Sequence, residues 1–185
     1  MKEKIIANRY AKALFDLAIE KDLQERINHD ALLIYDVCVS NREFILVLRS
    51  PVIKEKKKLA IIDQIFRKHL HELTLSFLKI ITSHRREGLI EEIAKQIIEI
   101  YKKYKNIITT KLTTAVKLDD DIRKRIIALL KEQTKAEIEL HEEINEELIG
   151  GFVLSYDDKQ YDASIITQLQ KLHHEFDENL FIKGY

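Results

Sequence analysis

Apolar residues recur through the first part of the chain at steps of three and four, the spacing that places side chains on one face of an α-helix. Six such segments succeed one another before residue 106. The first carries Ile6, Tyr10, Leu14 and Leu17 in register, with alanines spread around the rest of its circumference. The pattern predicts helices over about residues 4–20, 23–38, 40–48, 54–66, 70–81 and 90–104.

The fifth of these segments differs from the others because its apolar residues cover more than one face. The residues that together cover more than one face are Leu73, Leu75, Phe77, Leu78, Ile80 and Ile81. A helix that is apolar nearly all round must be buried on nearly all sides. We therefore expect this helix either to be central in the bundle or to turn a spare face toward another chain.

After residue 106 the spacing between apolar residues changes from three or four to two, which is the repeat of a β-strand. Alternation predicts strands over residues 107–118 and 136–144, and the triple Asp119–Asp121 opens a helix between them, where the macrodipole favours negative charge. The inward residues expected on that helix are Ile122, Ile126, Leu129 and Leu130. The fold class is therefore α+β, mainly α: an N-terminal six-helix bundle over residues 1–105, then a small mixed strand/helix domain over residues 106–185.

The densest turn chemistry lies between Leu148 and Leu172. The pair Gly150-Gly151 directly precedes a short apolar strand, Asp162 stands at the position of a helix N-cap, and leucines then follow at helical spacing. A phosphate-binding loop is excluded because the glycines precede the strand and no Lys-Ser/Thr follows them. A bulge or a turn is the favoured interpretation of the glycine pair.

Composition narrows the functional classes. The chain has 185 residues, with 31 basic side chains balanced by 31 acidic ones. A nucleic-acid-binding protein usually has a basic excess on one face, so neutrality disfavours that class. Cys38, the single cysteine, excludes an internal disulfide and is expected to be buried. No segment approaches the length of an apolar membrane span, and the charged N-terminus does not resemble a secretory signal, so we expect no direct membrane insertion.

No group of polar residues in the sequence has the spacing of a catalytic or metal-binding site. His69 and His71 are two residues apart, so on a helix their side chains point in different directions. The triple aspartate lacks the spaced oxygens and the glycine of a calcium loop. No nucleophile elbow or phosphate cradle is present. We therefore expect no catalytic, metal-binding or cofactor-binding residues. The basic segments Lys54–Lys58 and Arg85-Arg86 could bind anions, although a solvated outer face is the simpler interpretation.

Several motifs together resemble the delta subunit of bacterial F-type ATP synthases, called OSCP in mitochondria. The resemblance covers nearly the whole chain, and none of its motifs is catalytic. The C-terminal signature of that family combines a glycine pair, an apolar strand, an acidic turn, Asp-x-Ser and a Leu-rich helix. The matching motifs here are Gly150-Gly151, Asp157-Asp158, Asp162-Ala163-Ser164, the first-helix residues Tyr10 to Phe15, and Ser50-Pro51-Val52.

The resemblance implies a non-catalytic stator subunit that links the F1 head to the peripheral stalk, so that ion flow through Fo is coupled to ATP synthesis. It implies that the bundle binds the N-terminal helix of an alpha subunit between its first and fifth helices, that the C-terminal domain binds the b subunits, and that the protein is peripheral at the cytoplasmic face of the bacterial cell membrane. Gly150, Gly151, Asp162 and Ser164 would be structural. The residues expected to line the groove are Tyr10, Ala13, Leu14, Leu17, Phe77, Leu78, Ile80 and Ile81.

One alternative from another class stays open at this level. The chain could be a helical adaptor or a nucleic-acid-binding protein that uses Lys54–Lys58 and Arg85-Arg86. Retention on DNA or RNA that weakens with salt would favour this alternative, whereas co-purification with alpha and b subunits would favour the stator.

Overall fold

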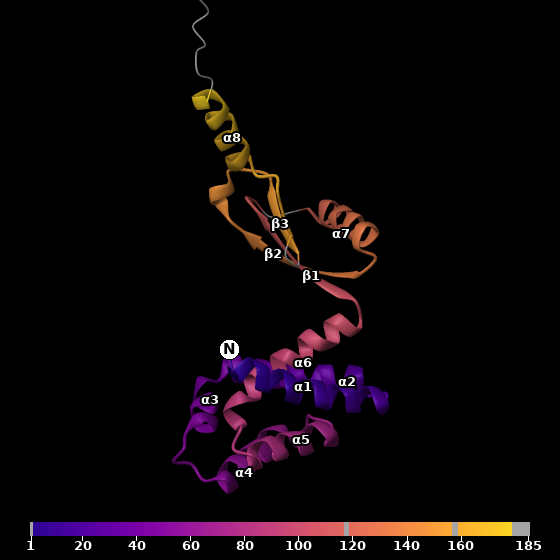
Figure 1. The fold of residues 1–185 in the computed structure, drawn as a ribbon, viewed down its shortest axis with the longest axis vertical. Helices are drawn as coiled ribbons and strands as arrows, with labels where there is room; N and C mark the ends of the chain where they lie inside the picture. Colours follow the sequence, from indigo (N-terminus) through magenta and orange to yellow (C-terminus); the bar gives the residue numbers. More distant parts are fainter. Residues whose placement is uncertain (1, 117–118, 157–158, 179–185) are drawn as a thin grey trace, which may run out of the picture. The chain divides into compact units, whose positions relative to one another are not determined.

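The computed structural model of the protein describes residues 2–116, 119–156 and 159–178. These residues form two compact units that divide between Tyr104 and Lys105 (Figure 1). Each unit has its own core. The first unit is helical, whereas the second combines a four-stranded sheet with helices. The α+β, mainly α fold class predicted from the sequence is therefore confirmed.

The helical unit contains six α-helices and one short 3₁₀ helix. Every helix predicted from the apolar spacing is present, with ends that differ from the prediction by a few residues. The elements are α1 (Lys2–Glu20), α2 (Gln24–Ser40), α3 (Arg42–Arg49), α4 (Glu55–Phe66), α5 (Glu72–Ser83), η1 (Glu87–Leu89) and α6 (Ile90–Tyr104).

Helix α6 is the centre of this unit, because α1 and α2 both pack along it (Figure 1). Close packing is possible because α1 turns its alanines Ala7, Ala11 and Ala18 inward, where each is fully buried. The larger side chains of Phe15 and Ile27 fill the space that remains. The small residues of α1 thus decide which of its faces meets the core.

A buried carboxylate ties α2 to the start of α5. Asp30 accepts hydrogen bonds from the backbone N–H of His71 at 2.8 Å and from the hydroxyl of Thr74 at 2.6 Å. Arg26, one turn earlier, lies 3.3 Å from the other carboxylate oxygen of Asp30 and donates to the carbonyl of His69. The N-terminus of α5 is therefore satisfied partly by a residue that is far away in sequence.

The boundary between α2 and α3 differs from what its local sequence suggests. The sequence Ser40-Asn41-Arg42-Glu43 has the form of a capping box that would begin at Ser40. In the structure Ser40 is the last residue of α2, and Asn41 is the N-cap of α3 without any side-chain capping bond. The two helices follow each other so closely that the serine has no room to act as the cap.

The second unit is built on a mixed sheet with strand order β2-β1-β3-β4. Strands β1 and β2 are parallel and are joined through α7, whereas β3 pairs antiparallel with both β1 and β4. The register places Leu112 opposite Leu154. The elements are β1 (Ile107–Thr114), α7 (Asp120–Thr134), β2 (Glu137–Ile144), η2 (Glu146–Leu148), β3 (Phe152–Tyr156), β4 (Lys159–Asp162) and α8 (Ile165–Glu178).

The core of this unit is small. Leu112, Leu130 and Leu154 are buried together, with Ile126 and several strand residues packed against them. The prediction of four inward residues on α7 is wrong at Ile122 and Leu129, whose side chains are exposed. Helix α7 packs mainly against β2, so the part of its apolar face that points past the sheet is left uncovered.

Candidate partner-binding surfaces

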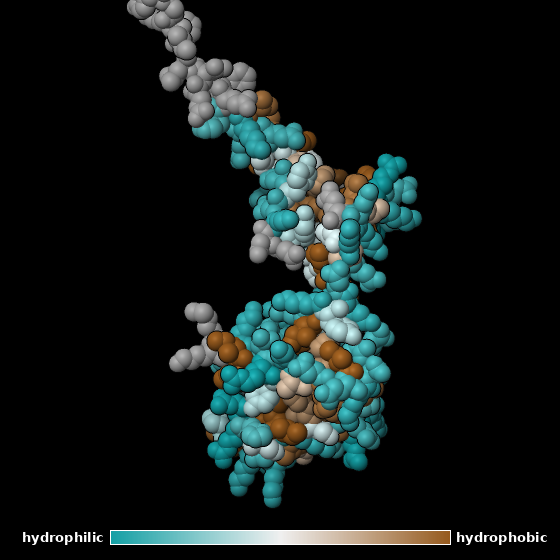
Figure 2. Space-filling model, turned by 45° about the vertical axis from the view of Figure 1, so that its right-hand side comes forward, coloured by the Kyte–Doolittle hydropathy of each residue, from teal (hydrophilic) through white to brown (hydrophobic). Residues whose placement is uncertain are grey.

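Apolar side chains from α1 and α5 form a partly open face on the helical unit, and Figure 2 shows apolar residues interrupting the polar surface of this unit. The two helices meet through an edge-to-face contact between the rings of Tyr10 and Phe77, whose centroids are 6.4 Å apart. On either side of this contact Leu17 is 37% exposed and Ile80 is 52% exposed, and Ala13 is exposed as well. We call these five residues the α1–α5 face.

Three of the residues predicted for the groove lie elsewhere. Leu14, Leu78 and Ile81 are buried in the bundle core. Together with Ile34 and Ile97 they surround a small interior void. These three side chains therefore stabilise the bundle rather than line its outer surface. Each directly follows a residue of the α1–α5 face: exposed Ala13, half-buried Phe77 and exposed Ile80.

The prediction from sequence missed two residues that extend the α1–α5 face. Ile6 lies four residues before Tyr10, and Leu73 lies four residues before Phe77; both side chains are half-buried. Residues four apart lie on the same side of a helix. The apolar spacing had already placed Ile6 in register with Tyr10 and named Leu73 on the fifth helix, but neither was included among the predicted groove residues.

The glycine pair of the C-terminal signature lets α8 approach the start of β3. A Cβ on Gly150 would lie 2.5 Å from the side chain of Ile165, and a Cβ on Gly151 would lie 2.2 Å from the carbonyl oxygen of Ala163. Gly151 also has φ +78°, a conformation that side chains rarely adopt. The backbone N–H of Ile165 donates to the carbonyl of Gly150 at 2.9 Å. The sequence predicted a bulge or a turn at the pair, and the structure has a bend there with the start of α8 close by.

Asp162 and Ser164 fix the start of α8, but their roles differ from those predicted. Ser164, which is fully buried, is positioned as the cap, because its hydroxyl oxygen accepts from the backbone N–H of Thr167 at 3.3 Å. Asp162 accepts from the backbone N–H of Ser164 and from the Thr167 hydroxyl, both at 2.9 Å. These hydrogen bonds from Ser164 and Thr167 lower the pKa of Asp162. The neighbouring acidic turn at Asp157-Asp158 lies outside the described residues.

The C-terminal unit presents two apolar surfaces of its own. Helix α8 exposes Ile165, Leu169 and Leu172 along one stripe, and Leu169 is 51% exposed. A hollow of about 420 Å³ lies between α7 and the strands β3 and β4, lined by aliphatic and aromatic side chains. The residues that line this hollow are Ile126, Leu129, Leu130, Phe152, Leu154, Tyr156 and Tyr161.

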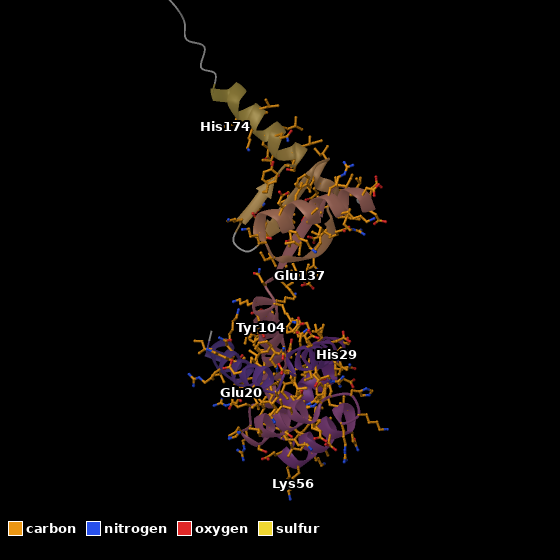
Figure 3. The ribbon with its side chains drawn as sticks, turned by 90° about the vertical axis from the view of Figure 1, so that its right-hand side faces the viewer. Glu20, His29, Lys56, Tyr104, Glu137 and His174 are labelled. Carbon is orange, nitrogen blue, oxygen red and sulfur yellow. The ribbon has the colours of Figure 1, made fainter. Side chains whose placement is uncertain are left out.

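The basic segments do not form one continuous charged stripe. Lys54, Lys56 and Lys57 are exposed, and Figure 3 shows Lys56 projecting away from the helical unit. Lys58 is buried instead, with its ammonium group 2.5 Å from a carboxylate oxygen of Glu87. Arg85 and Arg86 are exposed at the turn after α5. A long stripe of cations that could follow a nucleic-acid backbone is therefore interrupted by an internal ion pair.

Within the residues that the structure describes, no group of three His, Cys, Asp or Glu side chains could hold a metal ion. None of the helices in the described ranges is long and apolar enough to cross a bilayer. The apolar surfaces described above are the α1–α5 face on the helical unit, and the α8 stripe and the hollow on the sheet unit.

Comparison with known proteins gives a consistent result. The family model described as ATP synthase delta (OSCP) subunit matches residues 6–176. The chain is 34% identical over 180 residues to ATP synthase subunit delta of Cytophaga hutchinsonii, covering 97% of this chain and 98% of that protein. It is 36% identical over 176 residues to ATP synthase subunit delta of Christiangramia forsetii, covering 95% of each.

The fold also matches a chain in the cryo-EM structure of the Toxoplasma gondii mitochondrial ATP synthase hexamer, with a TM-score of 0.70. The match covers 94% of this chain and 98% of that chain at 24% sequence identity. The likeness therefore extends over both units of the fold.

Proposed function

Because the chain belongs to the ATP synthase delta (OSCP) subunit family, it is a non-catalytic stator subunit of an ATP synthase, and we propose which of its surfaces hold its neighbours. The helical unit binds the N-terminal helix of an alpha subunit at the α1–α5 face. The C-terminal unit binds the b subunits of the peripheral stalk. The protein works as a peripheral subunit on the cytoplasmic face of the bacterial cell membrane.

The observation that carries this proposal is the partial exposure of the α1–α5 face. Tyr10 and Phe77 touch each other at their ring edges but keep part of their surface open, and Ile80 is half exposed beside them. A groove between two helices, lined by apolar and aromatic side chains at helical spacing, is the surface that an amphipathic helix recognises. The buried neighbours Leu14 and Ile81 anchor the two helices in the core of the bundle.

The binding free energy expected for a helix at the α1–α5 face is moderate. Full burial of a large apolar side chain contributes about 1.5–3 kcal/mol, so the half-exposed residues here contribute roughly 1 kcal/mol each. Four of them, together with a comparable area on the bound helix, give about 8 kcal/mol before the costs of association and side-chain ordering are subtracted, so roughly micromolar affinity is the upper limit for this contact alone. A stator must resist torque from a motor in which each charge crossing 100 mV releases about 2.3 kcal/mol. A second contact through the C-terminal unit would raise the effective affinity without strengthening the first.

The C-terminal unit supports the second contact through the α8 stripe. Ile165, Leu169 and Leu172 are spaced so that one face of the helix is apolar, and each of them is exposed. The pair Gly150-Gly151 lets the first turn of α8 lie against the start of β3, which fixes the N-terminal end of the stripe. A helical stalk subunit would cover this stripe with an apolar stripe of its own.

The first experiment is a titration of the full-length chain with a labelled peptide from the N-terminus of the alpha subunit of the same organism, followed by fluorescence anisotropy. We expect saturable binding. Ile80→Asp should weaken it about tenfold or more, because a charge replaces an apolar contact. Tyr10→Ala should also weaken it, since the aromatic edge of the groove is lost.

Leu32→Asp on α2 is the matched control, because Leu32 is exposed to a similar extent as Ile80 but lies on a different helix. Its affinity for the peptide should equal that of the unchanged chain. The α1–α5 assignment would be abandoned if the peptide did not bind, or if both aspartate substitutions weakened binding equally.

A further inference from the structure

The turn that follows α5 places an arginine where the backbone favours glycine. The N–H of Arg85 donates to the carbonyl of Thr82 at 2.9 Å, and the N–H of Arg86 donates to the carbonyl of Ile81 at 3.0 Å. This pair of bonds is the Schellman motif, whose left-handed position is usually occupied by glycine. Arg85 holds that position with φ +57°. A residue kept in an unfavourable conformation invites a search for what its side chain does.

Arg85 lies at the edge of two neighbouring hollows. The larger is a cleft of about 510 Å³ between the turn after α5 and the loop that joins α3 to α4. The smaller, of about 340 Å³, lies between the same turn and the start of α1. Arg49, Arg85 and Glu87 line both hollows. Arg49 and Arg85, which are more than thirty residues apart in sequence, therefore lie at the same corner of the helical unit.

The charges of the larger cleft do not cancel. Lys58 and Glu87 neutralise each other at its floor, where the ammonium group also donates to the carbonyl of Leu48 at 2.6 Å. At the rim, Arg49 makes only a long contact of 3.4 Å with Glu91. The side chain of Arg85 has no hydrogen bond or ion pair within the part of the chain that the structure describes. Positive charge therefore remains in excess at the opening.

Two further features border the same opening. Helix α4 begins there, and its N-cap Lys54 makes no side-chain capping bond, so the partial positive charge of the helix start adds to that of the arginines. Lys54 has no charged partner in the described ranges. The acidic groups near the opening are Glu55, Glu91, which contacts Arg49, and Glu3, which lines the smaller hollow. Beside these cations the loop carries Val52, whose side chain is 87% exposed. The opening of the cleft therefore carries cationic side chains with one exposed apolar side chain, Val52, beside them.

We propose that this corner, defined by Arg49, Val52, Lys54 and Arg85, binds an acidic segment of a neighbouring protein subunit that also carries an apolar side chain. Carboxylates of the segment pair with the guanidinium groups of the arginines, which match carboxylate geometry in a bidentate manner. The apolar side chain covers Val52. The contact is a third one, in addition to those at the α1–α5 face and the α8 stripe, and it does not depend on either.

A protein segment fits the corner better than a nucleic acid does. Glu55 lies among the cations of the rim and would repel a continuous row of phosphates. The outward lysines Lys56 and Lys57 are on α4 but do not line the cleft. A carboxylate-bearing segment can place its charges individually and leave the acidic positions uncontacted, whereas a phosphate backbone cannot.

The test uses the full-length chain and a short fluorescein-labelled peptide in which glutamates alternate with leucine and serine. A twin peptide with glutamine in place of glutamate, and an oligothymidylate, serve as the competing probes. Arg85→Gly removes the cation and suits the left-handed backbone, so the variant should fold at least as well as the unchanged chain. Lys135→Gly is the matched control, because Lys135 is also a cation at a left-handed position, with φ 52°, at the end of α7.

We expect the glutamate peptide to bind in a salt-dependent manner, and Arg85→Gly to weaken this binding about fivefold, while Lys135→Gly leaves it unchanged. Adding Arg49→Gln to Arg85→Gly should weaken binding further. Equal binding by the glutamine twin, tighter binding of oligothymidylate, or unchanged affinity in Arg85→Gly would each overturn the proposal. Arg85→Gly leaves the α1–α5 face unchanged, so this variant should bind the alpha peptide as the unchanged chain does. A failure of this proposal can therefore be told apart from a failure of the α1–α5 assignment.

Discussion

The ion pair of Lys58 with Glu87 connects three segments that are distant in sequence. The ammonium group of Lys58 contacts the Glu87 carboxylate at 2.5 Å and donates to the carbonyl of Leu48 at 2.6 Å, so α4, η1 and the end of α3 meet at one point. Both side chains are almost fully buried. Removing one member of such a pair leaves the other charge without compensation in a dry environment.

The first prediction concerns this pair. Glu87→Gln should lower the free energy of unfolding by about 3–5 kcal/mol, because it leaves the Lys58 ammonium group buried without a carboxylate. Urea denaturation followed by circular dichroism measures the change. Arg49→Gln, which breaks an exposed pair with Glu91, should cost no more than about 1 kcal/mol. The double variant Lys58→Met/Glu87→Leu should recover most of the loss, and a Glu87→Gln loss no larger than that of Arg49→Gln would contradict the argument.

Cys38 gives a second prediction at this scale. Burial, and to a smaller extent the charge of Glu91, raise the pKa of the Cys38 thiol to about 12. Since the thiolate is the reactive form, the native protein should react with iodoacetamide at pH 8 far more slowly than the urea-unfolded chain does. Mass spectrometry of the alkylated protein measures the two rates, and equal rates would show that the thiol is accessible.

The raised pKa of Cys38 also determines whether the free energy of unfolding rises or falls with pH. The folded state keeps the Cys38 proton at a pH where the unfolded chain, in which the thiol has its ordinary pKa of 9.0, has lost it. The thiol therefore contributes most to stability below about pH 9, and this contribution falls as pH rises toward the folded-state pKa of about 12. The difference in unfolding free energy between the unchanged chain and Cys38→Ala should shrink over this range. A difference independent of pH would show that the pKa of the Cys38 thiol is not raised in the folded state.

At the scale of elements, the attachment of α8 depends on backbone space. Gly151→Ala would bring a Cβ to 2.2 Å from the backbone oxygen of Ala163, at a residue with φ +78°. The unfavourable conformation alone costs about 1 kcal/mol, and the clash with backbone raises the expected loss to about 2–4 kcal/mol. Hydrogen exchange of the β1 and β3 amides, compared with the amides of α6, would locate the loss in the C-terminal unit.

Gly88→Ala is the control for this substitution. A Cβ on Gly88 would lie 3.5 Å from the side chain of Arg49, which is an ordinary contact with a flexible group. We therefore expect little change in stability. If both alanine substitutions cost the same, close approach of α8 would not explain the glycine pair.

Helix α5 shows how far a single element could be predicted. Its apolar residues spread around the helix, which correctly indicates extensive burial, and Leu78 and Ile81 are indeed core residues. The sequence could not tell which apolar side is left open, because that depends on where α1 and α4 pack. Only the structure shows that Ile80 is on the open side.

At the scale of the whole molecule, the two units have separate cores and separate exposed apolar surfaces. We expect their contacts with partners to be independent. Leu169→Asp should weaken binding of the soluble part of the b subunit about tenfold or more and leave binding of the alpha peptide unchanged, while Ile80→Asp should do the reverse. Titrations of each variant with each partner give the four affinities.

Gln168→Asp is the control for the α8 stripe, since it adds the same charge at the neighbouring exposed position on α8. It should bind both partners as the unchanged chain does. If Leu169→Asp weakened both contacts, the surfaces would be coupled and the separate assignment would fail.

The sequence alone determined the helices, the change to a strand period after residue 106, and the backbone role of Gly150-Gly151. These features depend on residues close in sequence, whose spacing sets which side chains share a face. The tertiary structure decided that Leu14 is core while Leu17 is exposed, that Lys58 is buried against Glu87, and that Arg49 and Arg85 meet at one corner. These outcomes depend on contacts between distant segments, and a local pattern carries no information about which segments will meet.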